Sequence, residues 1–144
     1  MYFKINIYGP HDTHAKATLW NSLRTFIQTH NGKFMLFGDL NKVRDEPEHY
    51  GSTFSRSEAD CFNSFIQVTN LVEMPMGGRR FTWMNKPGTK MSKIDRFILS
   101  ESIINEIQDL KDTVLERGKS DHNPIFLHIE KSMVHARLSS FIRG

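Results

Sequence analysis

The stretch that decides the fold is Phe34-Met-Leu-Phe-Gly-Asp-Leu-Asn41. Large apolar side chains fill its first half, which is typical of a buried strand, and Gly38, Asp39 and Asn41 follow at its end. A glycine lets another backbone or a phosphate approach closely, and an acid and an amide beside it can build an anion or metal site. Taken alone, the same residues also fit an ordinary exit from a strand into a loop. Both interpretations stay open at this point.

The residues before this strand show first a strand pattern and then a helix pattern. Tyr2–Tyr8 alternates strictly between apolar and polar side chains, which predicts a strand that ends at Gly9-Pro10. A helix is predicted over about residues 12–30, because Asp12 or Thr13 can cap it and an apolar stripe runs along it. The order strand, helix, strand indicates the α/β class.

The rest of the chain predicts shorter elements. Residues 42–56 are polar and predict a surface excursion, in which we expect the acidic run Asp45, Glu46 and Glu48 to be solvated. We expect Cys61 to be a small buried side chain in a helix that Ser57 caps. The predicted elements are a helix at 57–69, a turn at 76–80, strands around 94–99, 113–116 and 124–129, and a helix near 101–107.

Composition narrows the class of protein. The 144 residues suit one domain, and 38% hydrophobic with 24% charged residues excludes a disordered chain. The net charge of +3 permits a polyanionic partner without requiring one. Cys61 is the single cysteine, so there is no disulfide partner within the chain. No apolar run is long enough to cross a membrane, and the first residues lack a signal-peptide pattern, so we expect an intracellular protein that is not secreted.

Four polar clusters stand at or near the predicted strand ends. They are Asn6 with Tyr8, Asp39 with Asn41, Asp95 alone, and Asp121 with His122. Strand ends are where sites assemble in layered α/β folds, so we expect these clusters to converge. A histidine held by one carboxylate, with further carboxylates and an amide nearby, suits the hydrolysis of a phosphodiester. Such a site orients water, donates to phosphate oxygens and offers oxygen ligands to Mg²⁺.

Five motifs, in this order, carry a resemblance. They are Asn6-Ile-Tyr-Gly-Pro10, Gly38-Asp-Leu-Asn41, Arg80-Phe-Thr-Trp83, Ser92-Lys-Ile-Asp95 and Ser120-Asp-His122. Together they resemble the endonuclease/exonuclease/phosphatase superfamily, and more narrowly the apurinic-type endonuclease domain of plant non-LTR (LINE-like) retrotransposons, which accompanies a reverse transcriptase. The resemblance implies the C-terminal part of a four-layer α/β sandwich of the pancreatic-deoxyribonuclease type, N-terminally truncated and incomplete. It covers residues 1–130, and we assign no structure to the tail, residues 131–144.

The resemblance also implies roles for individual residues. Asp39 would activate the attacking water or protonate the leaving oxygen, and Asn41 would hold Asp39 and a phosphate oxygen. His122 would donate to a non-bridging oxygen, with Asp95 keeping its imidazole protonated. Tyr8 would reach the phosphate or pack against Asp39.

Metal and substrate contacts follow from the same resemblance. Asp121 would be a ligand of Mg²⁺ or Mn²⁺, and the DNA substrate would be bordered by Asn6, Thr82, Trp83 and Ser92. A DNA substrate would be consistent with a protein located in the nucleus. Basic side chains around Trp83 suit either a DNA backbone or an ordinary surface; they are Arg79, Arg80, Lys86, Lys90, Lys93 and Arg96.

Simpler explanations compete at several positions. Tyr8 and Thr82 would also serve as cross-strand pairs. Asp95 would also form a salt bridge with Arg96 or Lys93, and Ser120-Asp121 would also make a plain turn.

The function expected from these residues is Mg²⁺-dependent phosphodiester hydrolysis by a DNA-nicking endonuclease. In the family a glutamate on a preceding strand is the principal metal ligand, and no residue here matches it, so by this resemblance the activity of the chain itself is in doubt. One alternative is a non-catalytic remnant that binds nucleic acid. Another is a phosphatase of the same fold.

Overall fold

The computed structural model describes residues 1–75, 77–78, 80–106, 110–114, 121–122, 125–129 and 137–140. Its central sheet has the strand order β1-β2-β8-β4. The four strands are β1 (Tyr2–Tyr8), β2 (Lys33–Asp39), β8 (Asp95–Ser100) and β4 (Leu71–Glu73). β1 runs parallel to β2, whereas β8 is antiparallel to both β2 and β4. The predicted element order of strand, helix and strand up to Asp39 is therefore confirmed, and a helix is the usual connection between two parallel strands.

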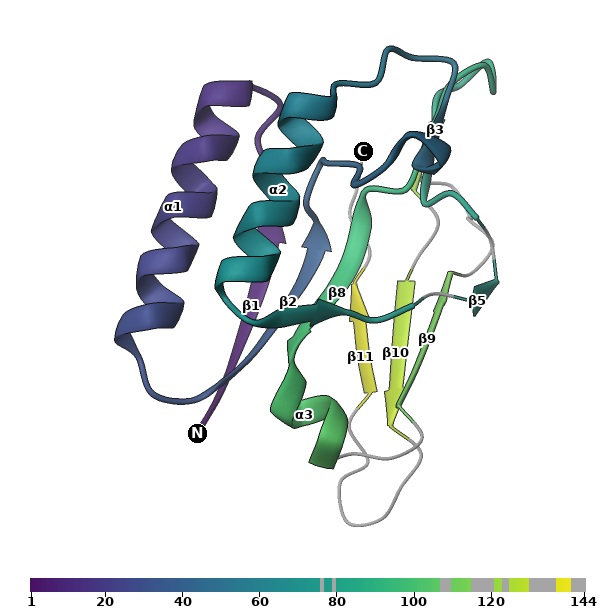
Figure 1. The fold of residues 1–144 in the computed structure, drawn as a ribbon. Helices are drawn as coiled ribbons and strands as arrows, with labels where there is room; N and C mark the ends of the chain where they lie inside the picture. Colours follow the sequence, from purple (N-terminus) through teal and green to yellow (C-terminus); the bar gives the residue numbers. More distant parts are fainter. Residues whose placement is uncertain are drawn as a thin grey trace.

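Two helices cover one face of this sheet (Figure 1). α1 (Thr13–Thr29) begins after Asp12, whose carboxylate accepts a hydrogen bond from the backbone N–H of Ala15 at 2.8 Å. α2 (Arg56–Val68) is capped by Ser55, which accepts from the N–H of Glu58, so the expected cap at Ser57 is wrong. Ser55 has the extended backbone that a capping residue needs, whereas Ser57 already lies inside the first turn.

The alternation of side chains along β2 divides the core into two clusters. Phe34 and Leu36 face the helices, where they pack with residues of α1 and α2 such as Trp20. Met35 faces the opposite side and packs with Phe97. A strand that is apolar on both faces is typical of a sheet covered on both sides, which explains the unbroken apolar run before Gly38.

A second sheet lies on the side of the central sheet away from the helices (Figure 1). Its order is β11-β10-β9-β5, formed by Arg137–Ser140, Ile125–Ile129, Leu110–Val114 and Gly77–Gly78. A small third sheet joins β3 (His49–Tyr50), β7 (Met91–Ser92) and β6 (Trp83–Met84), and the remaining helices are η1 (Glu46–Glu48) and α3 (Glu101–Glu106). The described residues thus form one helical layer and two sheet layers of an α/β sandwich.

Several expected elements differ in detail. β4 was not predicted, because three residues between a helix end and Met74 are too few to show a period. The strand expected at 113–116 lies at Leu110–Val114, and Gly77–Gly78 of the expected turn pairs with it as β5. Of the tail after residue 130, only β11 lies within the described residues.

Cys61 corrects a further expectation. Its thiol is exposed rather than buried. Phe62, the next residue of α2, is fully buried, and Cys61 lies one step round the helix from it, at the boundary with α1. None of the described helices is long and apolar enough to span a membrane.

Candidate active site

The end of β2 fixes Asp39 through its backbone. The N–H of Asn41 donates to Oδ1 of Asp39 at 2.8 Å, and the N–H of Gly9 donates to the Asp39 carbonyl at 2.6 Å. Gly38 has φ +124°, and a Cβ there would collide with the carbonyl oxygen of Ile7 on β1. A glycine is therefore required where β1 and β2 come together, immediately before the acid.

Asp95 lies beside Asp39 because β8 pairs with β2 in the register Asp39 opposite Asp95. The hydroxyl of Thr82 accepts from the backbone N–H groups of Ile94 and Asp95 at 2.9 and 3.1 Å and also contacts the Ser92 carbonyl. Thr82 has an exposed fraction of 0%. Its expected place at the border of a DNA groove is therefore corrected, since it holds the start of β8 from inside the protein.

His122 completes a buried cluster. Its Nδ1 lies 2.8 Å from Oδ2 of Asp95, and its Nε2 lies 3.7 Å from Oδ2 of Asp39. The indole N–H of Trp83 donates to Oδ2 of Asp121 at 3.0 Å, and the backbones of Trp83 and His122 form a β-bridge. Trp83 therefore positions the Asp121-His122 segment, a role that was not predicted from the sequence.

Burial and the neighbouring charges shift the pKa values of Asp39 and His122. Burial, with the nearby charge of Asp95, raises the pKa of Asp39 to about 6. Burial alone would lower the pKa of His122, but the hydrogen bond and charge of Asp95 outweigh it and raise that pKa above its ordinary value. Near neutral pH the arrangement therefore favours an ionised Asp39 facing an imidazolium at His122.

The same corner offers oxygen atoms for a cation. Asp39, Asp95 and His122 each place one ligand-type atom within 4.8 Å of the others, but Asp95 is already bonded to His122, and an imidazolium cannot bind a metal. Oδ1 of Asp121 is buried with no hydrogen-bond partner among the described atoms and lies 4.0 Å from Nε2 of His122. Asp39 and Asp121, which approach Nε2 of His122 to 3.7 and 4.0 Å, thus offer carboxylate oxygens of the kind that a hard divalent cation prefers.

The other expected site residues lie around this cluster. Tyr8 is the register partner of Asp39 on β1 and is 58% exposed, and Asn6 is exposed two residues earlier on the same face. The side-chain amide of Asn41 contacts Nδ1 of His11 at 2.9 Å and the Pro10 carbonyl at 3.3 Å. Asn41 therefore holds Asp39 through its backbone N–H, and its amide nitrogen is engaged with the 9–11 turn. Ser92 is half-buried on β7.

The competing explanation for Asp95 does not hold. Its carboxylate bonds to His122, while Arg96, on the opposite face of β8, bonds to Glu48 and Glu73. Glu48 is therefore not a solvated member of an acidic run, and Arg96 is not a surface cation. Alternation along a strand separates neighbours in sequence onto opposite faces, so the short spacing between Asp95 and Arg96 was misleading.

Comparison with known proteins agrees with this geometry. A family model described as an endonuclease-reverse transcriptase matches residues 2–126. The chain belongs to this family. It is thus a member of the endonuclease/exonuclease/phosphatase superfamily, as the five motifs indicated, and no curated protein matches its sequence.

One solved structure has a similar fold. The beta toxin of Staphylococcus aureus superposes with a TM-score of 0.59 at 18% identity, over 86% of this chain and 48% of the toxin chain. The chain therefore spans about half the length of that structure. At this identity the likeness establishes the fold, which agrees with the expected deoxyribonuclease-like α/β sandwich.

Replacing Thr82 with valine tests its positioning role. The change keeps the shape but leaves the N–H groups of Ile94 and Asp95 without their buried acceptor, so we expect a loss of about 1–3 kcal/mol in the free energy of unfolding. Urea unfolding would measure it. Thr53→Val, at an exposed position of the loop between β3 and α2, is the matched control and should change stability by less than about 0.5 kcal/mol. Equal losses in the two variants would contradict the assigned role of Thr82.

Proposed function

We propose that this chain carries the phosphodiester-cleaving part of a divalent-cation-dependent, DNA-nicking endonuclease. The observation that carries the proposal is the buried Asp95–His122 pair with the Asp39 carboxylate 3.7 Å from Nε2 of the imidazole. Family membership supports hydrolysis of a phosphate ester, and DNA as the substrate is the finer part of the proposal.

The three side chains suggest a division of labour. Asp39, whose pKa of about 6 suits a general base near neutral pH, would take the proton of the attacking water as its oxygen bonds to phosphorus. His122, held protonated by Asp95, would donate a hydrogen bond to a non-bridging phosphate oxygen as negative charge builds there. The bond from phosphorus to the leaving oxygen then breaks, and that oxygen takes a proton from solvent water.

The family implies a divalent cation, and the residues present fit one. Asp121, through its unpartnered buried oxygen, would hold it with help from Asp39. When bound, such a cation would neutralise charge on the phosphate. Because a hard divalent cation usually takes six or more oxygen ligands, about four more than these two carboxylates provide as single oxygens, we propose that the pair alone binds the cation weakly.

Features near the site favour a polyanionic substrate. Lys86 and Lys90 are exposed in the β6–β7 hairpin beside Trp83, which itself contacts Asp121. Basic side chains next to an aromatic ring suit a nucleic-acid backbone and base.

Nicking of a supercoiled plasmid tests the proposal. With Mg²⁺ present we expect conversion to the open circle, loss of conversion with EDTA, and none with Asp39→Asn combined with His122→Ala. No nicking by the unsubstituted chain, or equal nicking by the double variant, would overturn the proposal. Salt-sensitive DNA binding without cleavage would instead support a non-catalytic binding protein. Turnover of a soluble phosphate monoester but not of DNA would support a phosphatase.

The pH dependence of nicking provides a separate prediction. The rate should rise as pH increases through about 6, because Asp39 must lose its proton, and fall at higher pH as His122 loses its own. The initial nicking rate between pH 5 and 9, at about 0.1 M constant ionic strength, would show this bell shape. In the Asp39→Asn variant, the residual rate should no longer fall as the pH decreases below about 6. A rate that falls steadily from pH 5 upward would contradict the assignment of Asp39 as base.

A further inference from the structure

Arg96 is a fully buried cation on the face of β8 that points away from the site. Its exposed fraction is 0%, and its guanidinium also lies 5.7 Å from the ring of Phe62 on α2. A buried guanidinium is costly unless ion pairs and hydrogen bonds offset its desolvation. The Nε atom of Arg96 has no hydrogen-bond partner among the described atoms, whereas the two terminal nitrogens donate to four different groups.

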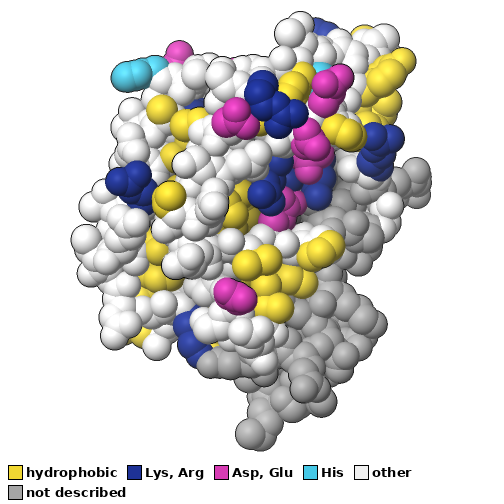
Figure 2. All heavy atoms as spheres, in the orientation of Figure 1, with side chains coloured by type: hydrophobic (Ala, Val, Ile, Leu, Met, Phe, Trp, Pro, Cys, Tyr) yellow, Lys and Arg dark blue, Asp and Glu magenta, His cyan; other side chains and the backbone are white. Residues whose placement is uncertain are grey.

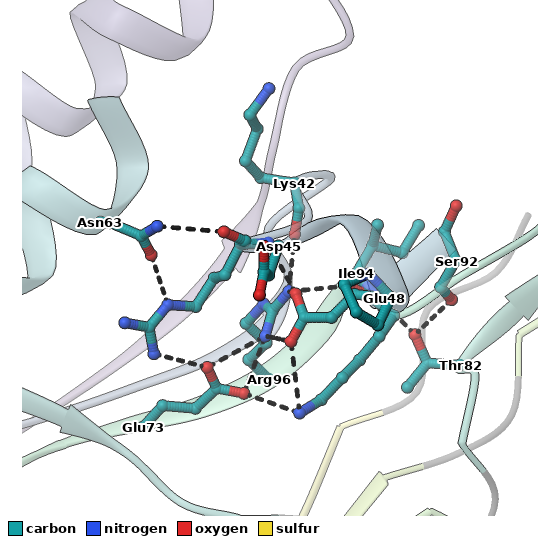
Figure 3. Close-up of polar contacts among 12 residues, drawn as sticks. Lys42, Asp45, Glu48, Asn63, Glu73, Thr82, Ser92, Ile94 and Arg96 are labelled. Atoms are coloured by element: carbon teal, nitrogen blue, oxygen red, sulfur yellow. Dashed lines mark hydrogen bonds and ion pairs between the residues drawn. The ribbon is translucent and has the colours of Figure 1, made fainter. Parts of the chain in front are cut away.

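Two of these groups are carboxylates (Figure 3). Nη1 donates to Oε2 of Glu73 at 2.8 Å and to Oε2 of Glu48 at 3.2 Å, and Nη2 donates to Oε1 of Glu48 at 2.5 Å. Lys93 adds a second cation, with Nζ 3.0 Å from Oε2 of Glu73. Burial would raise the pKa of Glu73, but Arg96, Lys93 and Arg44 outweigh it and lower that pKa to about 2.

The other two groups are backbone carbonyls, and their positions matter most. Nη2 donates to the carbonyl of Lys42 at 3.1 Å and to the carbonyl of Lys93 at 2.9 Å. Lys42 follows Asp39 by three residues, and Lys93 precedes Asp95 by two. One side chain therefore ties the segment that leaves β2 to the segment that enters β8.

The two segments are also joined directly next to the site. The N–H of Leu40 donates to the Ile94 carbonyl at 2.9 Å, and the N–H of Lys93 donates to the Glu48 carbonyl at 2.8 Å. Glu48 thus contacts Arg96 with its side chain and holds Lys93 with its backbone. The contacts of Arg96 and Glu48 therefore reach Lys42 and Lys93, and the Leu40–Ile94 hydrogen bond lies between these residues and the two carboxylates, Asp39 and Asp95.

We infer that Arg96, with Glu48, is a positioning pair that sets the distance between the Asp39 and Asp95 carboxylates from behind the sheet. The structural role of the pair follows from the contacts of Arg96. Its effect on catalysis rests in addition on the proposed function. The planar fork of arginine fits this role, because it presents several donors in fixed directions, which the flexible ammonium of lysine does not.

The surroundings of the pair agree with a structural rather than a substrate-binding role. Figure 2 shows acidic and basic side chains gathered together over the region of α2 and β3. Arg44 and Arg56 lie there beside Asp45 and Glu73, with which they form ion pairs. Positive and negative side chains that lie within a few ångströms of each other cancel, so this surface has no net attraction for a polyanion.

Amide hydrogen exchange of the full chain tests the inference. Glu48→Gln replaces one acceptor by a donor that faces the guanidinium and leaves the Glu48 backbone in place. We expect the N–H groups of Leu40 and Asp95 to exchange roughly tenfold faster, as for the loss of one charge-assisted hydrogen bond. The N–H groups of Leu36 and Ile98, in the middle of the same strands, should change less than about twofold. Glu46→Gln, exposed in the same short helix, is the matched control.

Nicking kinetics add a second measurement. Glu48→Gln should lower kcat by about tenfold or more with KM little changed, because misplaced catalytic groups lose rate rather than binding. Arg96→Lys should have the same effect in both measurements. Faster exchange at all four amides alike would show a merely stabilising pair and overturn the inference, as would unchanged exchange at Leu40 and Asp95. If the unsubstituted chain does not nick DNA, the proposed function fails, while the exchange pattern still decides the inference.

Discussion

Asp39→Asn is expected to lower the nicking rate by about 10²–10⁴ and, at neutral pH, to make the protein more stable. The loss of rate follows from the removal of the group that accepts the proton of the attacking water. Asparagine keeps the shape and the oxygen that the N–H of Asn41 contacts, so the local turn should persist. A fall in activity combined with a gain in stability separates a catalytic group from a structural one.

The sign of the stability change follows from the pKa of Asp39. Folding raises this pKa from 3.8 to about 6, so the folded protein disfavours the ionised form. Below pH 3.8 both states are protonated and there is no penalty; the penalty grows as pH rises and is complete above about 6. At pH 7 the variant should therefore gain up to about 3 kcal/mol in the free energy of unfolding, at about 1.4 kcal/mol per pKa unit.

Urea unfolding at pH 4 and pH 7 measures this difference. The gain of Asp39→Asn should be small at pH 4 and several times larger at pH 7. Asp60→Asn, on the exposed face of α2, is the control and should change stability by less than about 0.5 kcal/mol at either pH. A variant that is less stable than the unsubstituted protein at pH 7 would contradict the electrostatic description of the site.

Arg96→Met is expected to cost about 3–5 kcal/mol in the free energy of unfolding, a large part of the stability of a domain of this size. Methionine fills a similar volume but leaves Glu73, which is largely buried, without its main partner and leaves the carbonyls of Lys42 and Lys93 without a donor. Lys93 and Arg44 still contact Glu73 and limit the loss.

A lower midpoint of urea unfolding, with an unchanged dependence of the free energy of unfolding on urea concentration, would measure this cost. Arg24→Met, on the exposed side of α1, is the matched control and should change stability by less than about 0.5 kcal/mol. If Arg96→Met were as stable as the control, the buried network would have no energetic importance, and its role behind the site would lose support.

The sequence predicted those parts of the fold that depend on local periodicity. The alternation in Tyr2–Tyr8 and the apolar run before Gly38 were sufficient to place β1 and β2, because both patterns are set by burial on the faces of a sheet. Short elements were missed or shifted: β4 has three residues, which is too few to carry a period. The choice between Ser55 and Ser57 as the cap of α2 depends on backbone angles that no residue type reveals.

The residues of the candidate site were likewise predicted only in part. Asp39, Asp95 and His122 were predicted together from motifs and strand ends, and the structure brings them within hydrogen-bonding or near-contact distance. The supporting residues could not be predicted in this way. Arg96 bonds to Glu48 and Glu73, which are 48 and 23 residues away in sequence, so only the fold reveals the partners.

Thr82 was singled out for the wrong contact, and the contact of Trp83 with Asp121 was not predicted. Their places in the sequence signalled importance, but the hydroxyl of Thr82 and the indole N–H of Trp83 are directed at Asp95 and Asp121 within the protein. A motif marks which residues matter without showing whether they face substrate or another side chain. Burial decides between the two, and burial is a property of the packed chain.

The pKa of the His122 imidazole, measured by NMR titration of the metal-free protein, tests the central claim most directly. We predict a pKa above 6.5 in the unsubstituted protein and a clear fall in Asp95→Asn, because the carboxylate that stabilises the imidazolium is then neutral. A His122 pKa below 6.5, or one that does not respond to Asp95→Asn, would contradict a site built on a protonated histidine facing Asp39.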